Sequence, residues 1–208
     1  MVMPDRASIS GVILAAGSSA RLGRAKQLLP LVGVPLLTHV LRNASASQLD
    51  EIILVLGHEA DRIAAAVGDW GQRLVVSGDY AQGQSASLRA GLLALDPAAD
   101  AALFLLGDQP RVGPEVIDTL IAAYHAGAGS ILVPEYGGQR GNPILFARSL
   151  FPELARVTGD EGARGVVRAH ASEVVAVPVS DDPPPPDVDT EEDYADLQST
   201  WPASARVQ

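Results

Sequence analysis

The chain has 208 residues, a length that fits one domain with a substantial buried core. Its formal net charge of −10 argues against a nucleic-acid partner, and its 47% of apolar residues argue against a disordered chain. Because cysteine is absent, disulfide bonds and thiolate metal sites are excluded. An acidic protein that handles phosphates must concentrate cations locally, through a few Lys and Arg side chains or a metal ion.

Strands and helices are expected to alternate along the chain. Continuous apolar runs predict strands, whereas apolar residues at helical spacing predict helices. The expected strands, in chain order, are residues 8–15, 51–56, 73–77, 101–106, 130–134, 144–146 and 173–177. The expected helices are residues 35–46, 59–67, 85–95, 114–126 and 189–198.

This alternation favours an α/β fold, a single-domain three-layer sandwich around a mainly parallel, Rossmann-like sheet that is buried on both faces. Ligands of such sheets bind beyond the carboxyl ends of the strands. We expect the domain to span residues 1–199, with a stiff proline-rich connection at residues 181–187 and a loose tail at residues 200–208.

Nothing in the sequence indicates a membrane protein. No uninterrupted apolar run approaches the ~18 residues that a membrane span needs. Residues 1–10 lack the basic region and apolar stretch of a signal peptide. We therefore expect a cytoplasmic protein without a membrane partner.

The segment after the first expected strand combines small residues with cations. Ala15, Ala16 and Gly17 let the backbone approach a ligand closely and direct N–H groups at it. Arg21 and Lys26 add positive charge, so that this loop could hold a triphosphate. The structural alternative is a plain turn between a strand and a helix.

Two commoner phosphate-binding motifs do not fit this loop. The dinucleotide fingerprint needs three glycines, but no glycine stands between Gly17 and Gly23. The P-loop needs Gly-Lys-Ser/Thr, whereas Arg24 follows Gly23. Both motifs are excluded on spacing.

Residues 14–26 resemble the L-x-A-G-x-S-x-R-x-G-x-x-K signature of MobA-like nucleotidyltransferases. The Gln-Leu-Leu-Pro at residues 27–30 is similar to the molybdenum-cofactor cytidylyltransferase branch of that family. The resemblance extends over residues 9–197, with motifs in the family's order. It implies a fold of the nucleotide-diphospho-sugar transferase type and a Mg²⁺-dependent transfer of an NMP from an NTP to a phosphorylated acceptor.

The same resemblance implies CTP and molybdenum-bound molybdopterin as substrates, and a molybdenum oxidoreductase as a docking partner. The Ala-Ala-Gly at residues 15–17 looks more like the cytidylyl branch than the guanylyl branch. The alternatives are a GTP-using or sugar-phosphate nucleotidyltransferase, an NAD(P)H-dependent reductase on the same fold, and a non-catalytic carrier of the molybdenum cofactor.

Two aspartates are candidates for the metal site. Asp108 follows the most apolar expected strand, where a carboxylate would face the ligand crevice, and a turn or helix-capping role is its alternative. Asp189 lies in a D-V-D-T-E-E-D segment that resembles the family's second metal motif, although Asp189 or Thr190 could instead cap the last helix. The resemblance implies that Asp108 and Asp189 together hold Mg²⁺.

Two further segments are candidates for the sides of the cleft that take the base and the acceptor. Residues 82–87 resemble the family's base and ribose contact, although the serines there could simply cap a helix. Residues 138–143 resemble the family's G-x-x-G-[HN]-P segment, which a glycine-rich hairpin would explain equally well. Residues 159–164 resemble G-D-x-G-A-R, where Asp160 could instead cap the following helix. The acceptor-binding residues that this implies are Arg140, Asn142 and Arg164.

The resemblance thus implies a complete set of roles. The catalytic residues would be Arg21, Lys26 and Asp108. The nucleotide-binding residues would be Leu14, Ala15, Ala16, Gly17, Arg21, Lys26, Gly57, Asp79, Gly83, Ser85 and Ser87. The acceptor phosphate would attack the α-phosphorus in line and release pyrophosphate, and no general base is expected because a phosphate is already an anion.

Overall fold

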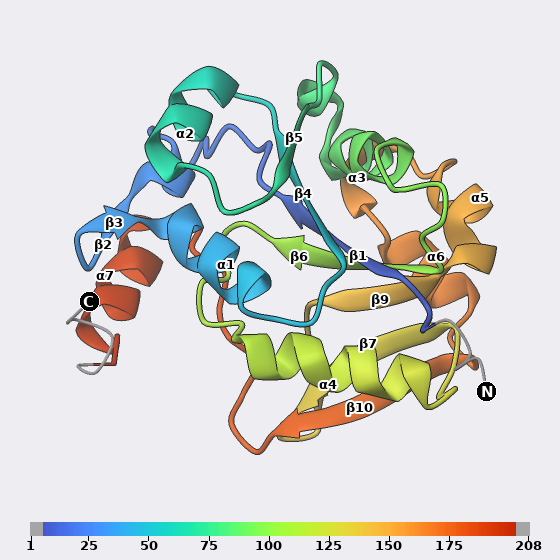
Figure 1. Ribbon diagram of the computed structural model, residues 1–208. Coiled ribbons are helices and arrows are strands. Elements are labelled where there is room, and N and C mark those ends of the chain that lie inside the picture. The colour runs from blue at the N-terminus through green and yellow to red at the C-terminus, as the bar shows by residue number, and fades with distance from the viewer. Residues whose placement is uncertain (1–5, 203–208) are drawn as a thin grey trace.

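The computed structural model describes residues 6–202 of the chain. Its middle layer is one eight-stranded sheet in the order β10-β7-β9-β6-β1-β4-β5, with β8 paired to β7 (Figure 1). The strands are β1 (Ile9–Leu14), β4 (Glu51–Leu56), β5 (Arg73–Val76), β6 (Ala101–Leu106), β7 (Ile131–Tyr136), β8 (Gln139–Arg140), β9 (Ile144–Ala147) and β10 (Val174–Ser180).

Parallel pairing dominates this sheet. Strand β1 pairs in parallel with β4 and β6, β4 with β5, and β7 with β10. Strand β9 runs antiparallel between β6 and β7, and the short β8 runs antiparallel to β7. The expected mainly parallel sheet is confirmed.

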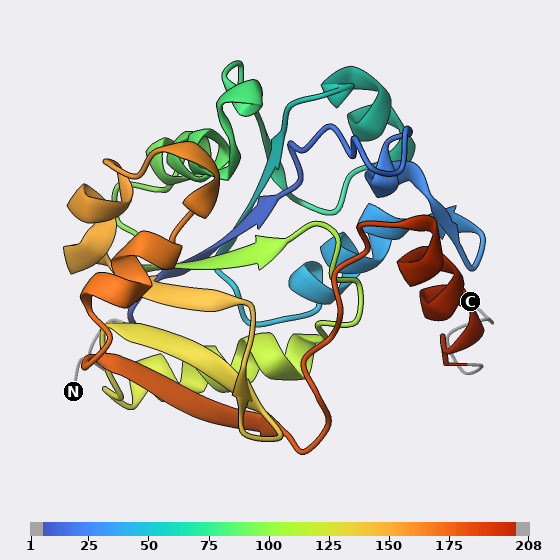
Figure 2. The ribbon, with the colours of Figure 1, turned by 180° about the vertical axis from the view of Figure 1, so that it is seen from behind.

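Helices cover both faces of the sheet and complete three layers, as the two opposite views show (Figures 1 and 2). The α-helices are α1 (Leu36–Ser45), α2 (Ala60–Val67), α3 (Gln84–Leu93), α4 (Pro114–His125), α5 (Phe151–Leu154), α6 (Arg164–Ala169) and α7 (Glu191–Ser199). Helices α1, α2 and α4 pack on one face, and α3, α5 and α6 pack on the other. No helix in residues 6–202 is long and apolar enough to span a membrane.

The alternation of side chains along the strands explains the two cores. In β6, Leu103 and Leu105 pack towards α1, α2 and α4, whereas Ala102 and Phe104 pack towards α3, α5 and α6. Since both sets are buried, the strand reads as a continuous apolar run. Strand β6 is therefore accessible to a ligand only at its carboxyl end, where Asp108 follows.

The structure differs from the sequence prediction in several local elements. Strand and helix ends shift, and the short helices α5 and α6 were not expected. A small hairpin of β2 (Pro30–Leu31) and β3 (Val34–Pro35) was also missed. These elements are too short to carry a clear periodicity.

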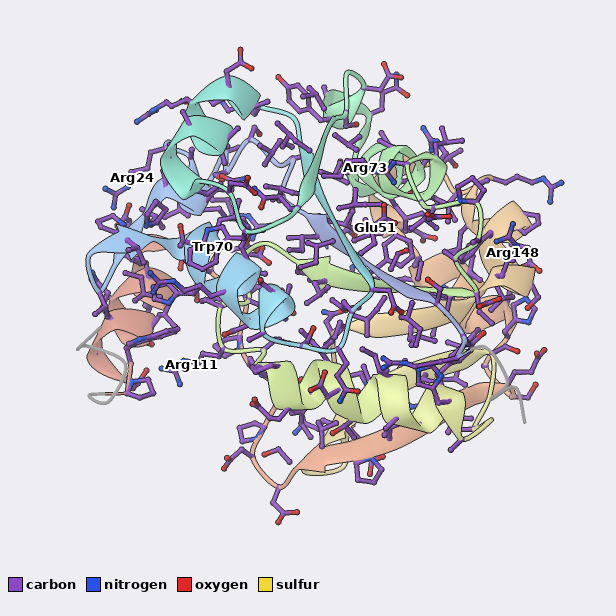
Figure 3. All side chains as sticks on the ribbon, viewed as in Figure 1. Arg24, Glu51, Trp70, Arg73, Arg111 and Arg148 are labelled. Carbon is purple, nitrogen blue, oxygen red and sulfur yellow. The ribbon has the colours of Figure 1, made fainter. Side chains whose placement is uncertain are left out.

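The end of the described chain packs against this hairpin region. Trp201 is only 8% exposed and belongs to a cluster with Leu31, Leu36 and the α7 residue Leu197. The guanidinium of Arg111, labelled in Figure 3, lies 5.9 Å from the centre of the Trp201 ring. Trp201 thus departs from the expected loose tail, while residues 203–208 of that tail lie outside the described residues.

Candidate active site

The loop after β1 is held in shape through its carbonyl groups. Gln27 Nε2 donates to Ala15 O (2.8 Å) and Gly17 O (3.1 Å), and the His58 N–H donates to Ala16 O (3.3 Å). With these oxygens engaged, the N–H groups of Ala16 and Gly17 have no protein partner within residues 6–202. The loop is therefore prepared to bind an anion through its backbone.

Hydrogen bonds of Ser19 shape the turn between this loop and Lys26. Its backbone has a φ of 55°, and its carbonyl accepts from the N–H groups of Leu22 (3.0 Å) and Gly23 (3.1 Å). The Ser19 Oγ accepts from the backbone N–H of Lys26 at 3.1 Å. This turn fixes the start of the lysine side chain at the edge of the sheet.

Lys26, the only lysine in the sequence, lies between the two aspartates. Its Nζ donates to Asp108 Oδ2 and to Asp189 Oδ1, the latter at 2.8 Å. Arg21 Nη1 donates to Asp189 Oδ2 at 2.9 Å. Burial lowers the pKa of Lys26, but the charges and hydrogen bonds of the two aspartates outweigh burial and raise it. The hydrogen bond from Lys26 lowers the pKa of Asp189.

Asp108 stands at the tip of β6 and has one free oxygen. Gly107 allows the close packing just before it, because a Cβ there would lie 2.7 Å from Ala15 Cβ. Asp108 Oδ1 is buried and has no hydrogen-bond partner among the described residues. This carboxylate oxygen is therefore available to a ligand in the cavity. The alternative capping role is wrong, because α4 begins at Pro114 without a side-chain cap.

The Asp189 side chain is not used to cap α7, because Thr190 is the capping residue, and Asp189 lines the same cavity as Asp108. Thr190 Oγ1 accepts from the Asp193 N–H (3.1 Å), and the Asp193 carboxylate accepts from the Thr190 N–H (2.8 Å), which forms a capping box. The Val188 N–H donates to Asp108 O at 3.3 Å and ties the two aspartate segments together.

One cavity of about 680 Å³ joins these groups. Of the residues named from the sequence, it is lined by Leu14, Ala15, Ala16, Gly17, Lys26, Gly83, Ser87, Asp108, Arg164 and Asp189. Arg21 reaches its edge through the ion pair with Asp189. The sequence analysis had therefore named ten of the residues that line this cavity.

Three predicted nucleotide contacts do not line this cavity. Gly57 packs behind the loop, where a Cβ would lie 2.6 Å from Tyr80 Cβ and 2.8 Å from Ala16 O. Ser85 is fully buried within α3, and Asp79 is exposed beside the 3₁₀ turn that begins at Tyr80. Gly57 thus provides space for Tyr80, and Gly57, Asp79 and Ser85 are not among the residues that line this cavity.

Several lining residues were given no binding role by the sequence analysis. They include Gln27, Tyr80, Gln84, Asp160 and Asp187. Burial raises the pKa of Asp187, and the charges of Asp108 and Asp189 raise it further. The spacing of Asp187 and Asp189 could have revealed this third carboxylate, because alternate residues of an extended segment face the same side. The alternative cap at Asp160 is wrong, since α6 begins without a side-chain cap.

Close glycine contacts bring two distant motifs together at this cavity. A Cβ at Gly83 would lie 2.8 Å from Gly159 O, and a Cβ at Gly162 would lie 2.5 Å from Gln84 Oε1. Only glycine permits such an approach, so the start of α3 packs directly on residues 159–162. This packing carries Arg164 to the cavity wall.

A second cavity of about 270 Å³ adjoins the first. The two share the lining residues Leu14, Gln84, Leu106 and Arg164. The three residues expected to bind the acceptor, Arg140, Asn142 and Arg164, all line the second cavity. The fold thus places the expected nucleotide and acceptor sides next to each other.

The arginines of the second cavity differ from others in the chain. Arg73 pairs with Glu51 at 2.6 Å, and Arg148 donates to two backbone carbonyl groups (both are labelled in Figure 3); neither arginine lines the two cavities. The side chains of Arg140 and Arg164 make no hydrogen bond or ion pair within residues 6–202. Two cations are therefore available to an anionic ligand.

Comparison with known proteins identifies relatives over nearly the whole chain. Nicotine blue oxidoreductase from Paenarthrobacter nicotinovorans is 33% identical over 198 residues, which cover 90% of this chain and 95% of that protein. The purine catabolism protein PucB from Bacillus subtilis (strain 168) is 31% identical, covering 88% of this chain and 93% of that protein.

Solved structures extend this comparison. Rv0371c from Mycobacterium tuberculosis H37Rv has 38% sequence identity and a TM-score of 0.86, over 93% of this chain and 98% of that chain. A complex of Rv0371C with manganese has 36% identity and a TM-score of 0.81, over 93% and 99% of the two chains. The model of the MobA-like NTP transferase domain matches residues 11–174. The chain therefore belongs to the family of MobA-like NTP transferases, as its loop signature predicts.

Proposed function

We propose that this protein transfers CMP from CTP to the phosphate of molybdenum-bound molybdopterin and releases pyrophosphate, with Mg²⁺ as cofactor. One observation carries the proposal. Lys26, Asp108 and Asp189 converge beside the Ala15–Gly17 loop in a single cavity, next to a second cavity with two arginines that have no partner within residues 6–202. This arrangement suits a triphosphate and a phosphorylated acceptor.

The residues of the larger cavity fit a divalent cation. Asp108 offers a buried oxygen without a partner, and Asp189 offers a carboxylate nearby. No group of three or more His, Cys, Asp or Glu residues within residues 6–202 forms a complete metal site. Two carboxylates suit Mg²⁺, which completes its coordination with phosphate oxygens and water. The manganese complex of Rv0371C supports a divalent cation in this family.

When bound, Mg²⁺ would supply neutralisation of negative charge on the triphosphate. Lys26 compensates the charges of Asp108 and Asp189 in the free protein, and its ammonium group would be available to the phosphates once those carboxylates hold a cation. Arg21 adds charge at the edge of the cavity, and the N–H groups of Ala16 and Gly17 hold phosphate oxygens. The chain thus aligns two anions that would otherwise repel each other.

The acceptor needs orientation more than activation. Its phosphate is already an anion, so that no side chain has to remove a proton before attack at the α-phosphorus. Arg140 and Arg164 would hold this acceptor phosphate beside the triphosphate, and Asn142 would orient the remainder. The new bond joins an acceptor phosphate oxygen to the α-phosphorus, and the bond to the β-phosphate oxygen breaks.

The choice of CTP and the molybdenum cofactor within this family rests on the Ala15-Ala16-Gly17 loop and the Gln-Leu-Leu-Pro that follows it at residues 27–30, which are similar to the cytidylyl branch. We further propose that the reaction takes place in the cytoplasm and that the product passes to a molybdenum oxidoreductase.

The test is a panel of CTP, GTP, ATP and UTP with Mg²⁺ and the purified molybdenum cofactor, with pyrophosphate release as the readout. We expect release with CTP at least tenfold faster than with the other nucleotides, and none after EDTA. Equal rates with all nucleotides would refute the choice of base. A cofactor-bound protein that releases no pyrophosphate would indicate a carrier.

A second candidate, an NAD(P)H-dependent reductase, is favoured by the name and 33% identity of nicotine blue oxidoreductase. A reductase would oxidise NADPH and would keep its rate in EDTA, since hydride transfer does not need the carboxylate pair. Absorbance at 340 nm with an organic dye as acceptor separates it from the transferase. Oxidation of NADPH without pyrophosphate release would replace the proposed function.

A further inference from the structure

Four consecutive prolines, Pro183–Pro186, lie in the connection between strand β10 and helix α7. Proline fixes its own φ near −65°, and a residue that precedes a proline is restricted to extended backbone. Asp182 and the first three prolines all precede a proline, so that the segment is extended and stiff. We call Pro183–Pro186 the proline brace. Figure 2 shows the connection from β10 to α7 passing the end of β6.

The brace begins against the hairpin of β7 and β8. The Gly137 N–H donates to Ser180 O at 2.8 Å, just before the brace. A Cβ at Gly141 would lie 3.3 Å from Pro184 Cβ. Because Gly141 has no Cβ, the Pro184 ring packs directly on the backbone of the hairpin. We call residues 140–142, which line the second cavity, the acceptor rim.

The brace ends at the two aspartates of the first cavity. Gln109 Nε2 donates to Pro185 O at 3.3 Å, and the Gln109 side chain is buried, with 6% of the residue exposed. The Val188 N–H donates to Asp108 O at 3.3 Å, and Asp189 follows in the chain. Two hydrogen bonds therefore tie the end of the brace to the segment that carries Asp108.

The acceptor rim has little other support. Strand β8 (Gln139–Arg140) has only two residues, and among the described residues it pairs with β7 alone. Besides this ladder, the Tyr136 hydroxyl donates to Asn142 O at 2.9 Å. A short two-stranded hairpin is only marginally stable by itself. A stiff segment packed on its backbone therefore limits the movement of the rim.

The position of the rim matters because in-line attack depends on alignment. A displacement of about 1 Å between reacting groups can lower a rate by about 10²-fold. The acceptor rim and Asp189 lie on segments that are far apart in the chain, and the brace contacts the first and leads directly into the second. A flexible connection of the same length would join these segments without fixing their separation.

We propose that the proline brace is a positioning element, in which Pro184 and Pro185 fix the separation between the acceptor rim and the Asp108–Asp189 pair. This inference rests on the proposed function and adds two positioning residues to the residues assigned there. Neither proline touches the reacting atoms. Their contribution is to hold the acceptor phosphate in line with the nucleotide.

The rigidity can be measured directly because the sequence has no cysteine. Gln139→Cys in β8 and Glu192→Cys in α7, both at exposed positions, carry nitroxide spin labels on the full chain. Double electron–electron resonance then gives the distribution of distances between the hairpin and α7. We expect a narrow distribution for the four prolines and one about twice as wide after Pro184→Gly with Pro185→Gly. Equal widths overturn the proposal.

Two further variants guard this comparison. Pro97→Gly, an exposed proline before β6, is the matched control and should leave the width unchanged. Equal broadening by Pro97→Gly would contradict a special role of the brace. If the double glycine variant does not fold, Pro184→Ala with Pro185→Ala keeps the Cβ that packs on Gly141 and loses only the ring restraint. We expect a smaller broadening from it, and an unchanged width overturns the proposal.

The kinetics separate positioning from simple support of the fold. Pro184→Gly with Pro185→Gly should lower kcat for pyrophosphate release about tenfold or more and leave the KM for CTP unchanged. Mn²⁺ binding without nucleotide, measured by electron paramagnetic resonance, should also stay unchanged, because the buried Val188 keeps Asp189 in place. A lower melting temperature with a wild-type kcat would show a merely structural role and overturn the proposal.

The outcome is separable from the fate of the proposed function. If the glycine variant broadens the distance distribution but wild type releases no pyrophosphate with the molybdenum cofactor, the brace is rigid and the transfer is refuted. If wild type releases pyrophosphate and the glycine variant matches it in rate and in width, the transfer stands and the positioning role is refuted.

Discussion

The two cavities at the carboxyl end of the sheet share a wall but are prepared for their ligands in opposite ways. In the larger one, the cation of Lys26 and the carboxylates of Asp108 and Asp189 already satisfy each other. In the smaller one, Arg140 and Arg164 have no protein partner within the described residues, and the interior is apolar. The charged groups of the larger cavity must exchange their ion-pair partners when a ligand binds. The arginines of the smaller cavity only have to gain a partner.

This difference explains how an acidic chain can bind two phosphate compounds. A triphosphate brings its own divalent cation, which can take over the aspartates from Lys26 and leave the lysine to the phosphates. The acceptor brings less charge and meets cations that are already free. We therefore expect the nucleotide side to depend on metal and the acceptor side to be largely independent of it.

The largest effect is expected from Asp108→Asn, which removes the charge of the buried carboxylate. We predict a loss of pyrophosphate release of about 10³-fold or more, because charge stabilisation is the main contribution in such transfer. Thermal unfolding should show a folded protein. Asp61→Asn, an exposed carboxylate in the first turn of α2, is the control and should keep the wild-type rate. Near-normal activity of Asp108→Asn would mean that the metal ligand is a different residue.

The exchange at Lys26 can be observed directly because the sequence has no other lysine. Incorporation of ¹³C-labelled lysine during expression labels this side chain without changing its N–H donors, and NMR then reports its surroundings. We predict that Mg²⁺ with CTP shifts the Lys26 Cε signal, whereas CTP in EDTA shifts it much less. An unmoved signal would show that Lys26 stays on the aspartates and that the metal binds elsewhere.

Replacement of the same lysine separates its two roles. Lys26→Met should lower the turnover rate by about 10²-fold, since it removes one charge from the transferring phosphate. It should also tighten Mn²⁺ binding in the absence of nucleotide, measured by electron paramagnetic resonance, because no ammonium competes for the carboxylates. If the variant raised only the KM for CTP, the lysine would serve ground-state binding.

On the acceptor side, Arg140→Gln and Arg164→Gln should act on binding. Each loses a charge-assisted hydrogen bond of about 1.5 kcal/mol or more, which corresponds to about a tenfold higher KM for the acceptor. The KM for CTP should change little for Arg140→Gln, because Arg140 lines the second cavity alone. Arg156→Gln, an exposed arginine outside both cavities, is the matched control. A change in the KM for CTP with Arg140→Gln would contradict the division into two sides.

The smallest effect concerns the support of the acceptor rim. Burial raises the pKa of Tyr136 to about 12, with a further contribution from the charge of Glu115. Tyr136→Phe removes the hydrogen bond to Asn142 O and should lower the free energy of unfolding by about 1 kcal/mol at neutral pH. Because the folded pKa lies above the ordinary 10.0, the advantage of the wild type is complete below pH 10 and is lost as the pH rises towards 12. Urea unfolding at pH 8 and pH 11 measures both differences, and an equal difference at the two values would be inconsistent with a buried phenol.

The fold, and the meeting of Asp108 with the Ala15–Gly17 loop at one cavity, could be predicted from the sequence because both depend on local patterns. The apolar run of β6 and the Gly-Asp that ends it place Asp108 at the sheet edge without any knowledge of tertiary structure. The small residues of the Ala15–Gly17 loop likewise mark a close backbone approach. Parallel strands then bring these ends together by topology alone.

Contacts between segments that are far apart in the chain could not be predicted from the sequence. The fit of Gly83 against Gly159 and of Gly162 against Gln84 depends on the packing of α3 on a short 3₁₀ turn, which has no periodic signal. The position of Ser85 inside α3 could not be separated from a base contact by residue type. Trp201 lies in a cluster that exists only because the β2–β3 hairpin returns to α7.

The most direct test of the account compares wild type and Asp108→Asn in pyrophosphate release from Mg·CTP with the molybdenum cofactor. We predict release by the wild type that stops in EDTA, and a loss of about 10³-fold in the variant with unchanged thermal unfolding. Equal release by both proteins, or release that persists in EDTA, would contradict a reaction at the Asp108–Asp189 pair.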